Sequence, residues 1–206
     1  MSHSFTRSLI RHAGVALLAA ACIGPAAALT LQGPAYITPS TTIPTCGAVC
    51  LGVGTNILQI ADGDTSDFNG WAGRDGQVGV IVLDLLGDFN LTSFSLWNDI
   101  NIAREGVGDF RLNFYDSANN FLQSSAIYTA PISQVAAGVY SFASVANVSR
   151  VDLEVLSLLT GGACCRIEIR EVAFEGVAAV PEPATYALLV AGFGLMGYIG
   201  RRRRSR

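Results

Sequence analysis

The sequence predicts an all-β protein whose central part is a jelly-roll β-sandwich. In three segments, apolar and polar residues alternate with a period of two, which gives each strand one face for a core and one for solvent. Turn-forming residues separate these segments from further apolar runs, and no convincing amphipathic helix lies between Leu29 and Val180. About seven or eight short strands at this spacing indicate a sandwich.

Strands are expected at 78–86, 91–97, 110–115, 139–142, 151–155 and 167–170. Turns are expected at Gly87–Asp88, Glu105–Gly106, Asp116–Asn120 and Gly161–Gly162.

The apolar parity changes within the last predicted strand. Ile167 and Ile169 share one parity, whereas Val172 and Phe174 have the opposite one. A bulge inserts one extra residue and re-aims a side chain at the end of a sheet. We therefore expect a bulge at Arg170–Glu171.

Residues 1–28 have the pattern of a secretory signal peptide. Arg7 and Arg11 form a basic start, an apolar stretch follows, and Ala26–Ala28 supplies an A-x-A cleavage site before Leu29. This predicts export through the Sec translocon and cleavage by signal peptidase. The alternatives are a buried N-terminal helix and a lipoprotein attachment at Cys22.

The last 27 residues combine three features in a fixed order. A V-P-E-P motif is followed by an uncharged apolar stretch at 184–200 and by a basic tail at 201–206. The stretch is long enough to predict a transmembrane helix if the arginines snorkel, and the arginine cluster marks the cytoplasmic side. The motif residues are Val180, Pro181, Glu182 and Pro183.

This arrangement resembles the PEP-CTERM sorting signal of Gram-negative exported proteins. The resemblance implies processing by the membrane enzyme exosortase. It also implies an intermediate anchored in the inner membrane and a final place at the cell surface or in an extracellular polysaccharide matrix. The sorting signal occupies 180–206, so the exported domain is expected at 29–179.

The charge and composition of the exported domain exclude several functions. Between Leu29 and Val180 there are six arginines, 15 acidic residues and no lysine or histidine, which gives a charge near −9. This charge argues against nucleic acid as a partner. The missing histidine and lysine exclude histidine-dependent triads, histidine metal sites and Schiff-base chemistry, and leave paired carboxylates as the common hydrolytic option.

Four cysteines remain after signal cleavage, and an even number in an exported chain predicts disulfides. The spacing is not that of a standard zinc site. We favour cross-links between the start and the end of the domain over one local loop with a vicinal pair, and the pairing stays open. The cysteines are Cys46, Cys50, Cys164 and Cys165.

The segment from Ala61 to Gly87 resembles the opening of discoidin, or F5/8 type C, domains, which are galactose-binding-like jelly rolls. The sequence A-D-G-D-T-S-D, then Trp71, then the apolar strand ending in Asp84-Leu85 follows the family's order. It departs from the family at Asp67, where threonine is usual, and in the late position of Trp71. The resemblance implies that Trp71 is packed in the core.

In that family the loop often holds calcium with carboxylates, main-chain carbonyls and a glutamate from the last strand. The resemblance thus implies calcium as a cofactor. An acidic turn held by its own side-chain hydrogen bonds is the alternative. The residues that match the ligand positions are Asp62, Asp64, Asp67 and Glu171.

A carbohydrate-binding surface needs an exposed aromatic ring beside polar groups, and the best such cluster is Trp97, Asn98, Asp99 and Arg104. The leading hypothesis is a non-catalytic, carbohydrate-binding-like protein sorted to the surface. The alternatives are a purely structural matrix or envelope protein and, last, a carboxylate-based hydrolase with two acids about 5–10 Å apart.

Overall fold

The computed structural model describes residues 27–47, 54–100, 105–131, 136–159, 166–179, 189–194 and 196. The described part of the chain contains nine β-strands, one short 3₁₀ helix and helical residues at 189–194 and 196. The strands are β1 (Leu29–Gln32), β2 (Ile37–Thr41), β3 (Trp71–Ala72), β4 (Gly79–Asn98), β5 (Asp109–Tyr115), β6 (Phe121–Ser124), β7 (Tyr128–Thr129), β8 (Gly138–Val155) and β9 (Glu168–Ala178). The helix, η2, spans Ile57–Ala61.

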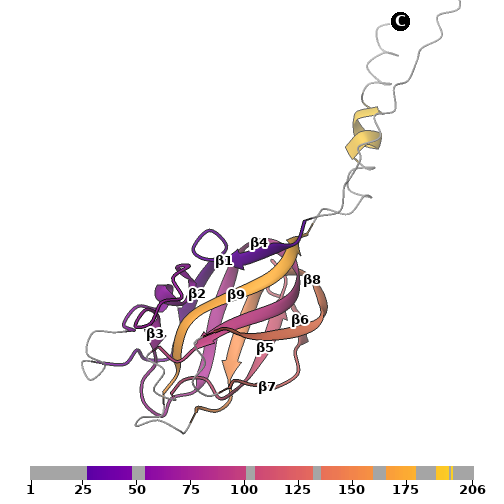
Figure 1. Cartoon of the computed structure of the whole chain (residues 1–206). Coiled ribbons are helices and arrows are strands. Elements are labelled where there is room, and N and C mark those ends of the chain that lie inside the picture. The colour runs from indigo at the N-terminus through magenta and orange to yellow at the C-terminus, as the bar shows by residue number, and fades with distance from the viewer. Residues whose placement is uncertain are drawn as a thin grey trace, which may run out of the picture.

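Two long strands, β4 and β8, belong to both layers of the sandwich (Figure 1). The first part of β4 pairs with β2 and with the last part of β8, which in turn pairs with β5. From Phe89 onwards, β4 pairs with β9 and with the first part of β8. The register of β4 on β8 is irregular between Asp84 and Phe89, where the strands cross from one layer to the other.

The two layers enclose one main hydrophobic core. Phe94 lies at its centre, with its ring centroid 5.8 Å from that of Phe110 and 5.1 Å from that of Phe174. Trp71 is fully buried, and its indole Nε1 donates a hydrogen bond to Thr45 Oγ1 over 3.1 Å. The prediction that Trp71 is a core residue is therefore confirmed.

Each predicted strand overlaps an observed strand, but some boundaries were wrong: β4 and β9 begin one residue later than predicted, at Gly79 and Glu168. The pair Gly87–Asp88, predicted as a turn, lies inside β4, because the chain bends there without reversing. The segments 139–142 and 151–155 are likewise parts of one strand, β8. The turn at Asp116–Asn120 is confirmed between β5 and β6, and Gly161–Gly162 lies outside the described residues.

The predicted bulge in the last strand is confirmed. Trp97 of β4 is opposite Glu171 of β9, whereas the next residue, Asn98, is opposite Ile169. Arg170 is thus one extra residue in β9, as the change of parity indicated.

Both ends of the sandwich domain lie side by side. β1 begins at Leu29, opposite Gly176 near the end of β9. The start of β9, beside β3, lies at the other end of the sandwich (Figure 1).

Within the described residues no helix is long and apolar enough to cross a membrane, and most of the predicted span at 184–200 lies outside them. The span therefore stays a prediction.

We expect Gly70→Ala to destabilise the fold much more than Gly76→Ala. Both glycines have positive φ, at 124° and 71°. A Cβ at Gly70 would overlap the Ile169 carbonyl oxygen and approach Arg170 Cα to 2.6 Å, whereas a Cβ at Gly76 would meet nothing within 4 Å. Urea denaturation should show a loss of about 1 kcal/mol for Gly76→Ala and about 3 kcal/mol for Gly70→Ala. Equal losses would contradict the close approach of Gly70 to β9.

Candidate functional site

The acidic loop, residues 62–70, is held by hydrogen bonds from its own side chains. Asp62 Oδ1 accepts from the Asp64 amide and Asp64 Oδ1 from the Ser66 amide, each over 2.9 Å. The Asn69 amide group donates to both Asp62 oxygens and to the Asp64 carbonyl. Hydrogen bonds from Ser66 also lower the pKa of Asp64. The loop is therefore ordered by the Asx turns that its sequence favours.

Glu171 lies under this loop and is fully buried. Its Oε2 accepts a hydrogen bond from the Gly63 amide over 3.0 Å, and its Oε1 is buried without a hydrogen-bond partner in the described part of the chain. Burial, helped by the charge of Asp62, raises the pKa of Glu171 to about 8 against the effect of the Gly63 hydrogen bond. The bulge at Arg170 thus aims a buried carboxyl group at the acidic loop.

The structure brings only some of the four predicted calcium ligands together. Asp62 and Glu171 are neighbours, whereas Asp67 forms an ion pair with Arg170, with Oδ1 3.0 Å from Nη1. Among the described residues, no group of three or more histidine, cysteine, aspartate or glutamate side chains is arranged to hold a metal ion. Calcium therefore remains a prediction, and its carboxylate ligands would be Asp62 and Glu171.

At the end of β4, the predicted ligand-binding cluster is largely internal. Asn98 donates from Nδ2 to the Val107 carbonyl over 2.8 Å and accepts at Oδ1 from the Val107 amide over 2.9 Å. Asp99 is fully buried, and its Oδ2 accepts from the Glu105 amide. Both residues hold the next segment in place, and their contact with a ligand stays a prediction. Trp97 is half-buried, and Arg104 lies outside the described residues.

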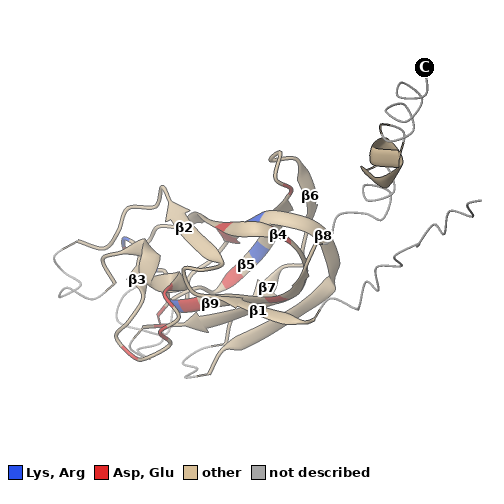
Figure 2. Ribbon diagram, turned by 90° about the horizontal axis from the view of Figure 1, so that it is seen from above, with Lys and Arg blue, Asp and Glu red and all other residues tan. Residues whose placement is uncertain are grey.

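A buried ionic cluster lies at the start of β9, and no pattern in the sequence indicated it. Arg166 Nε donates to Glu168 Oε1 over 2.6 Å, and Arg166 Nη2 lies 3.0 Å from Glu105 Oε2. Burial raises the pKa of Glu168 against the effect of Arg166. The alternation in 166–170 suggested that the charged residues face solvent, but Glu168 and Arg170 are as buried as the isoleucines. Figure 2 shows these charges on β9 beside β3.

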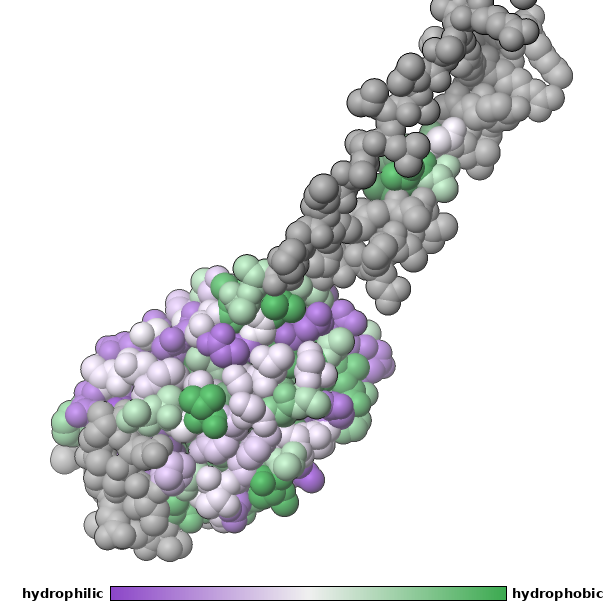
Figure 3. Space-filling view, turned by 45° about the vertical axis from the view of Figure 1, so that its right-hand side comes forward, coloured by the Kyte–Doolittle hydropathy of each residue, from purple (hydrophilic) through white to green (hydrophobic). Residues whose placement is uncertain are grey.

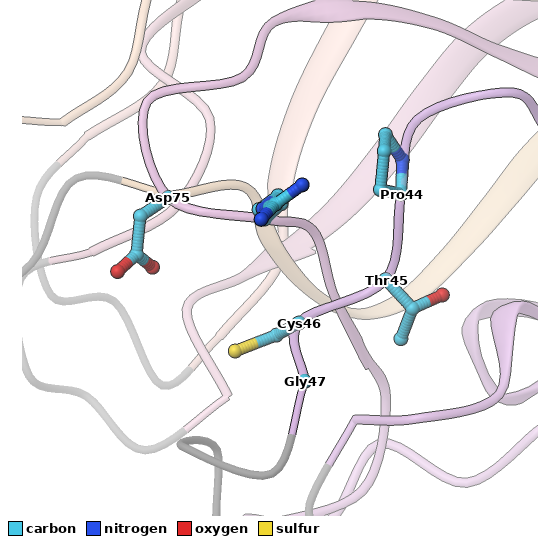
Figure 4. Close-up of a pocket in the computed structure, with 6 residues that line it drawn as sticks. Pro44, Thr45, Cys46, Gly47 and Asp75 are labelled. Atoms are coloured by element: carbon cyan, nitrogen blue, oxygen red, sulfur yellow. The ribbon is translucent and has the colours of Figure 1, made fainter.

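A cavity of about 310 Å³ opens at the same end of the sandwich. In Figure 4, the Cys46 side chain points into the space between its own segment and the loop that carries Asp75. Arg166 approaches two of the residues around this space, with Nη1 3.7 Å from Cys46 Sγ and 3.9 Å from Asp75 Oδ1. The lining residues are Pro44, Thr45, Cys46, Gly47, Arg74 and Asp75.

Cys46 is disulfide-bonded. Its contact with Arg166 places it next to the residue that follows Cys164 and Cys165 in the chain. Cys50, Cys164 and Cys165 lie outside the described residues, so the pairing across the domain stays a prediction.

The fold is that of family 32 carbohydrate-binding modules, as three solved structures show. The module of Clostridium perfringens NanJ, in complex with galactose, matches with a TM-score of 0.56 and 12% identity over 72% of this chain and 99% of that chain. The C. perfringens module CpGH89CBM32-5, in complex with GalNAc-beta-1,3-galactose, matches with a TM-score of 0.55 and 16% identity over 71% and 99%. The module of Streptococcus pneumoniae EndoD gives a TM-score of 0.54 and 12% identity over 71% and 98%.

The tail carries the PEP-CTERM protein-sorting motif, which matches at residues 179–204. This match and the discoidin-like galactose-binding fold of the structural neighbours confirm both resemblances that the sequence suggested. No curated protein sequence matches the chain.

In calcium-free buffer, the free energy of unfolding should fall as the pH rises from about 4.5 to 8. The pKa of Glu171 is 4.5 in its ordinary state and about 8 in the folded protein. Across this window the folded state therefore keeps a proton that the unfolded state has released, so the stabilisation is complete below the lower value and is lost through the higher one.

The slope that Glu171 contributes is about 1.4 kcal/mol per pH unit. Glu171→Gln should remove it, because glutamine is uncharged in both states. Urea denaturation at several pH values measures the difference between the two proteins. Parallel pH profiles would show that the carboxyl group of Glu171 is solvated in the folded state.

Proposed function

We propose that this chain is an exported, non-catalytic carbohydrate-binding protein that exosortase sorts to the bacterial envelope or extracellular matrix. The observation that carries the proposal is the likeness to family 32 carbohydrate-binding modules over about 70% of the chain, together with the sorting motif that follows directly after it. The Sec translocon and signal peptidase would act first and exosortase afterwards, on a form anchored in the inner membrane.

The positions of the chain termini and of the loops fit a domain that is held by its C-terminal tail. Leu29 and Gly176 are paired, so the chain enters and leaves the sandwich at one end. The cavity and the acidic loop belong to segments packed against the other end of β9. A domain held by its tail would therefore direct these loops away from the membrane, towards extracellular polysaccharide.

The residues near the cavity support binding rather than hydrolysis. Among the residues that the structure describes, Asp75 is the one acidic residue that lines it, whereas a glycosidase needs two carboxyl groups on either side of the scissile bond. Glu105 and Glu168 are buried and paired with Arg166. The exported domain also has no histidine or lysine to act as a general base.

We also propose calcium as a stabilising ion between Asp62 and Glu171. The buried Oε1 of Glu171 is the observation that favours it, because a cation can replace the proton that this carboxyl group retains. The loop carbonyl groups would complete the coordination, since calcium takes six to eight oxygen ligands. Asp67 is not included, because Arg170 already neutralises it.

The full chain, purified in detergent after export, should bind a glycan on an array that contains galactose- and GalNAc-terminated oligosaccharides. These sugars are those bound by two of the structural neighbours. A dissociation constant in the range of about 0.01–1 mM would be normal for one shallow site. Absence of binding to the whole array would favour the purely structural role in the matrix.

Calcium should raise the midpoint of thermal unfolding by several degrees, about 2–4 °C for each kcal/mol of stabilisation. The rise should be absent in Glu171→Gln, measured against excess chelator. Asp116→Asn is the matched control, because Asp116 orders an Asx turn and none of the buried glutamates in the described part of the chain contacts it. The loss of stability that Asp116→Asn causes, relative to the wild type, should be the same with calcium as with chelator. A calcium response that persists in Glu171→Gln would exclude this site.

A further inference from the structure

Phe68 has a backbone conformation that aromatic residues rarely adopt. Its φ is 65°, in the left-handed region. The other non-glycine residues with positive φ in the described part of the chain are one aspartate and two asparagines, which tolerate this region because their side chains bond locally. A phenylalanine has no such compensation. Strain of this kind persists only where the surroundings impose it, and it gathers at functional sites.

The residues on both sides of Phe68 impose this conformation. Before it, Asp67 is fixed by the ion pair with Arg170, whose side chain is 1% exposed. After it, Asn69 is held by Asp62 and Asp64, and Gly70 is pressed against β9. The Phe68 amide itself donates to the Ile100 carbonyl over 3.0 Å. The loop is therefore rigid at the point where the strained residue stands.

The ring of Phe68 contributes nothing to the core. Phe68 as a whole residue is 64% exposed, and it does not belong to the hydrophobic core cluster. Figure 3 shows one face of the molecule, on which hydrophobic and hydrophilic residues are interspersed without a single large apolar patch. Asparagine or glycine would satisfy the backbone at position 68 better and would expose less apolar surface. The fold alone thus gives no reason for phenylalanine here.

The surroundings of Phe68 suit a sugar more than a membrane or a protein core. Ser66 and Asp67 next to it are exposed and offer a hydroxyl and a carboxylate for hydrogen bonds. Asp62 and Asp64 make the loop acidic, which disfavours anionic lipid surfaces and sugars that carry carboxylates. Ile100, bonded to the Phe68 amide, lies two residues after Asn98 at the end of β4.

We propose that Phe68 is a preformed stacking platform for the apolar face of a neutral pyranose ring. Aromatic residues supply large, rigid contact surfaces, and a few polar groups at the edge fix the orientation of the ligand. The strained backbone keeps the ring in solvent, so no rearrangement is needed on binding. This inference rests on the proposed carbohydrate-binding function and assigns a residue to it that lies outside the cavity of Figure 4.

The test compares Phe68→Asn, Phe68→Trp and the wild-type full chain on an array of neutral and uronate-containing oligosaccharides. Phe68→Asn should weaken binding to neutral glycans by at least about tenfold. The same variant should raise the unfolding midpoint by about 3 °C, because asparagine relieves the backbone strain. Phe68→Trp should bind within about threefold of the wild type, since it keeps the aromatic face. Lost binding in a more stable protein is a combination that misfolding cannot produce.

Leu58→Asn is the matched control, because Leu58 is an exposed apolar residue (51%) in the neighbouring helix η2 with no backbone strain. It should change neither binding nor stability. Wild-type binding that Phe68→Asn leaves intact would overturn the platform and leave the carbohydrate-binding function standing. A wild type that binds no glycan would overturn both. Binding of the wild type to phosphatidylglycerol vesicles that Phe68→Asn abolishes, with glycan binding unchanged, would assign Phe68 to a membrane instead.

Discussion

The extra residue in β9, Arg170, determines how the acidic loop sits on the sandwich. Without it, the residues after Ile169 would keep the original alternation, and Glu171 would not lie beneath Gly63. With it, Arg170 turns to Asp67 and Glu171 to the start of the same loop. One irregularity in strand pairing thus fixes two separate points of a loop about 100 residues earlier in the chain. A bulge is local in sequence but long-range in its effect.

Much of this could be predicted because the pattern is periodic. The alternation in 110–115 and 151–155 appears in the structure as two paired strands, with Phe110 opposite Val155 and Phe114 opposite Val151. The change of parity after Ile169 located the bulge, since each strand residue must face one side or the other. The sorting motif and the fold resemblance could also be recognised from the sequence. A short motif whose residues occur in a fixed order is recognisable even when the rest of the sequence is not.

The parts that could not be predicted depend on contacts between distant segments. Asn98 follows Trp97 and was predicted to contact a ligand, yet its side-chain amide forms hydrogen bonds with both the carbonyl and the amide group of Val107. The sequence pattern predicts that Glu168 is exposed to solvent. In the structure its carboxylate is buried and accepts hydrogen bonds from Arg166 and from the Ile100 amide. The bend at Gly87–Asp88 resembles a turn in the sequence, because a bend within a strand and a chain-reversing turn favour the same residue types. Only the pairing of β4 with β8 on both sides of it distinguishes the two.

If the domain is held by its tail and binds a matrix at its other end, as proposed above, the direction of β9 has a mechanical consequence. β9 runs from the loop end of the sandwich to the tail end (Figure 1), and it pairs with β4 on one side and β1 on the other. A pull on the tail would act along this strand, while its hydrogen bonds lie across it. The load would be shared among many bonds in shear rather than opening them one after another. The last strand would therefore serve as the tether's anchor inside the domain.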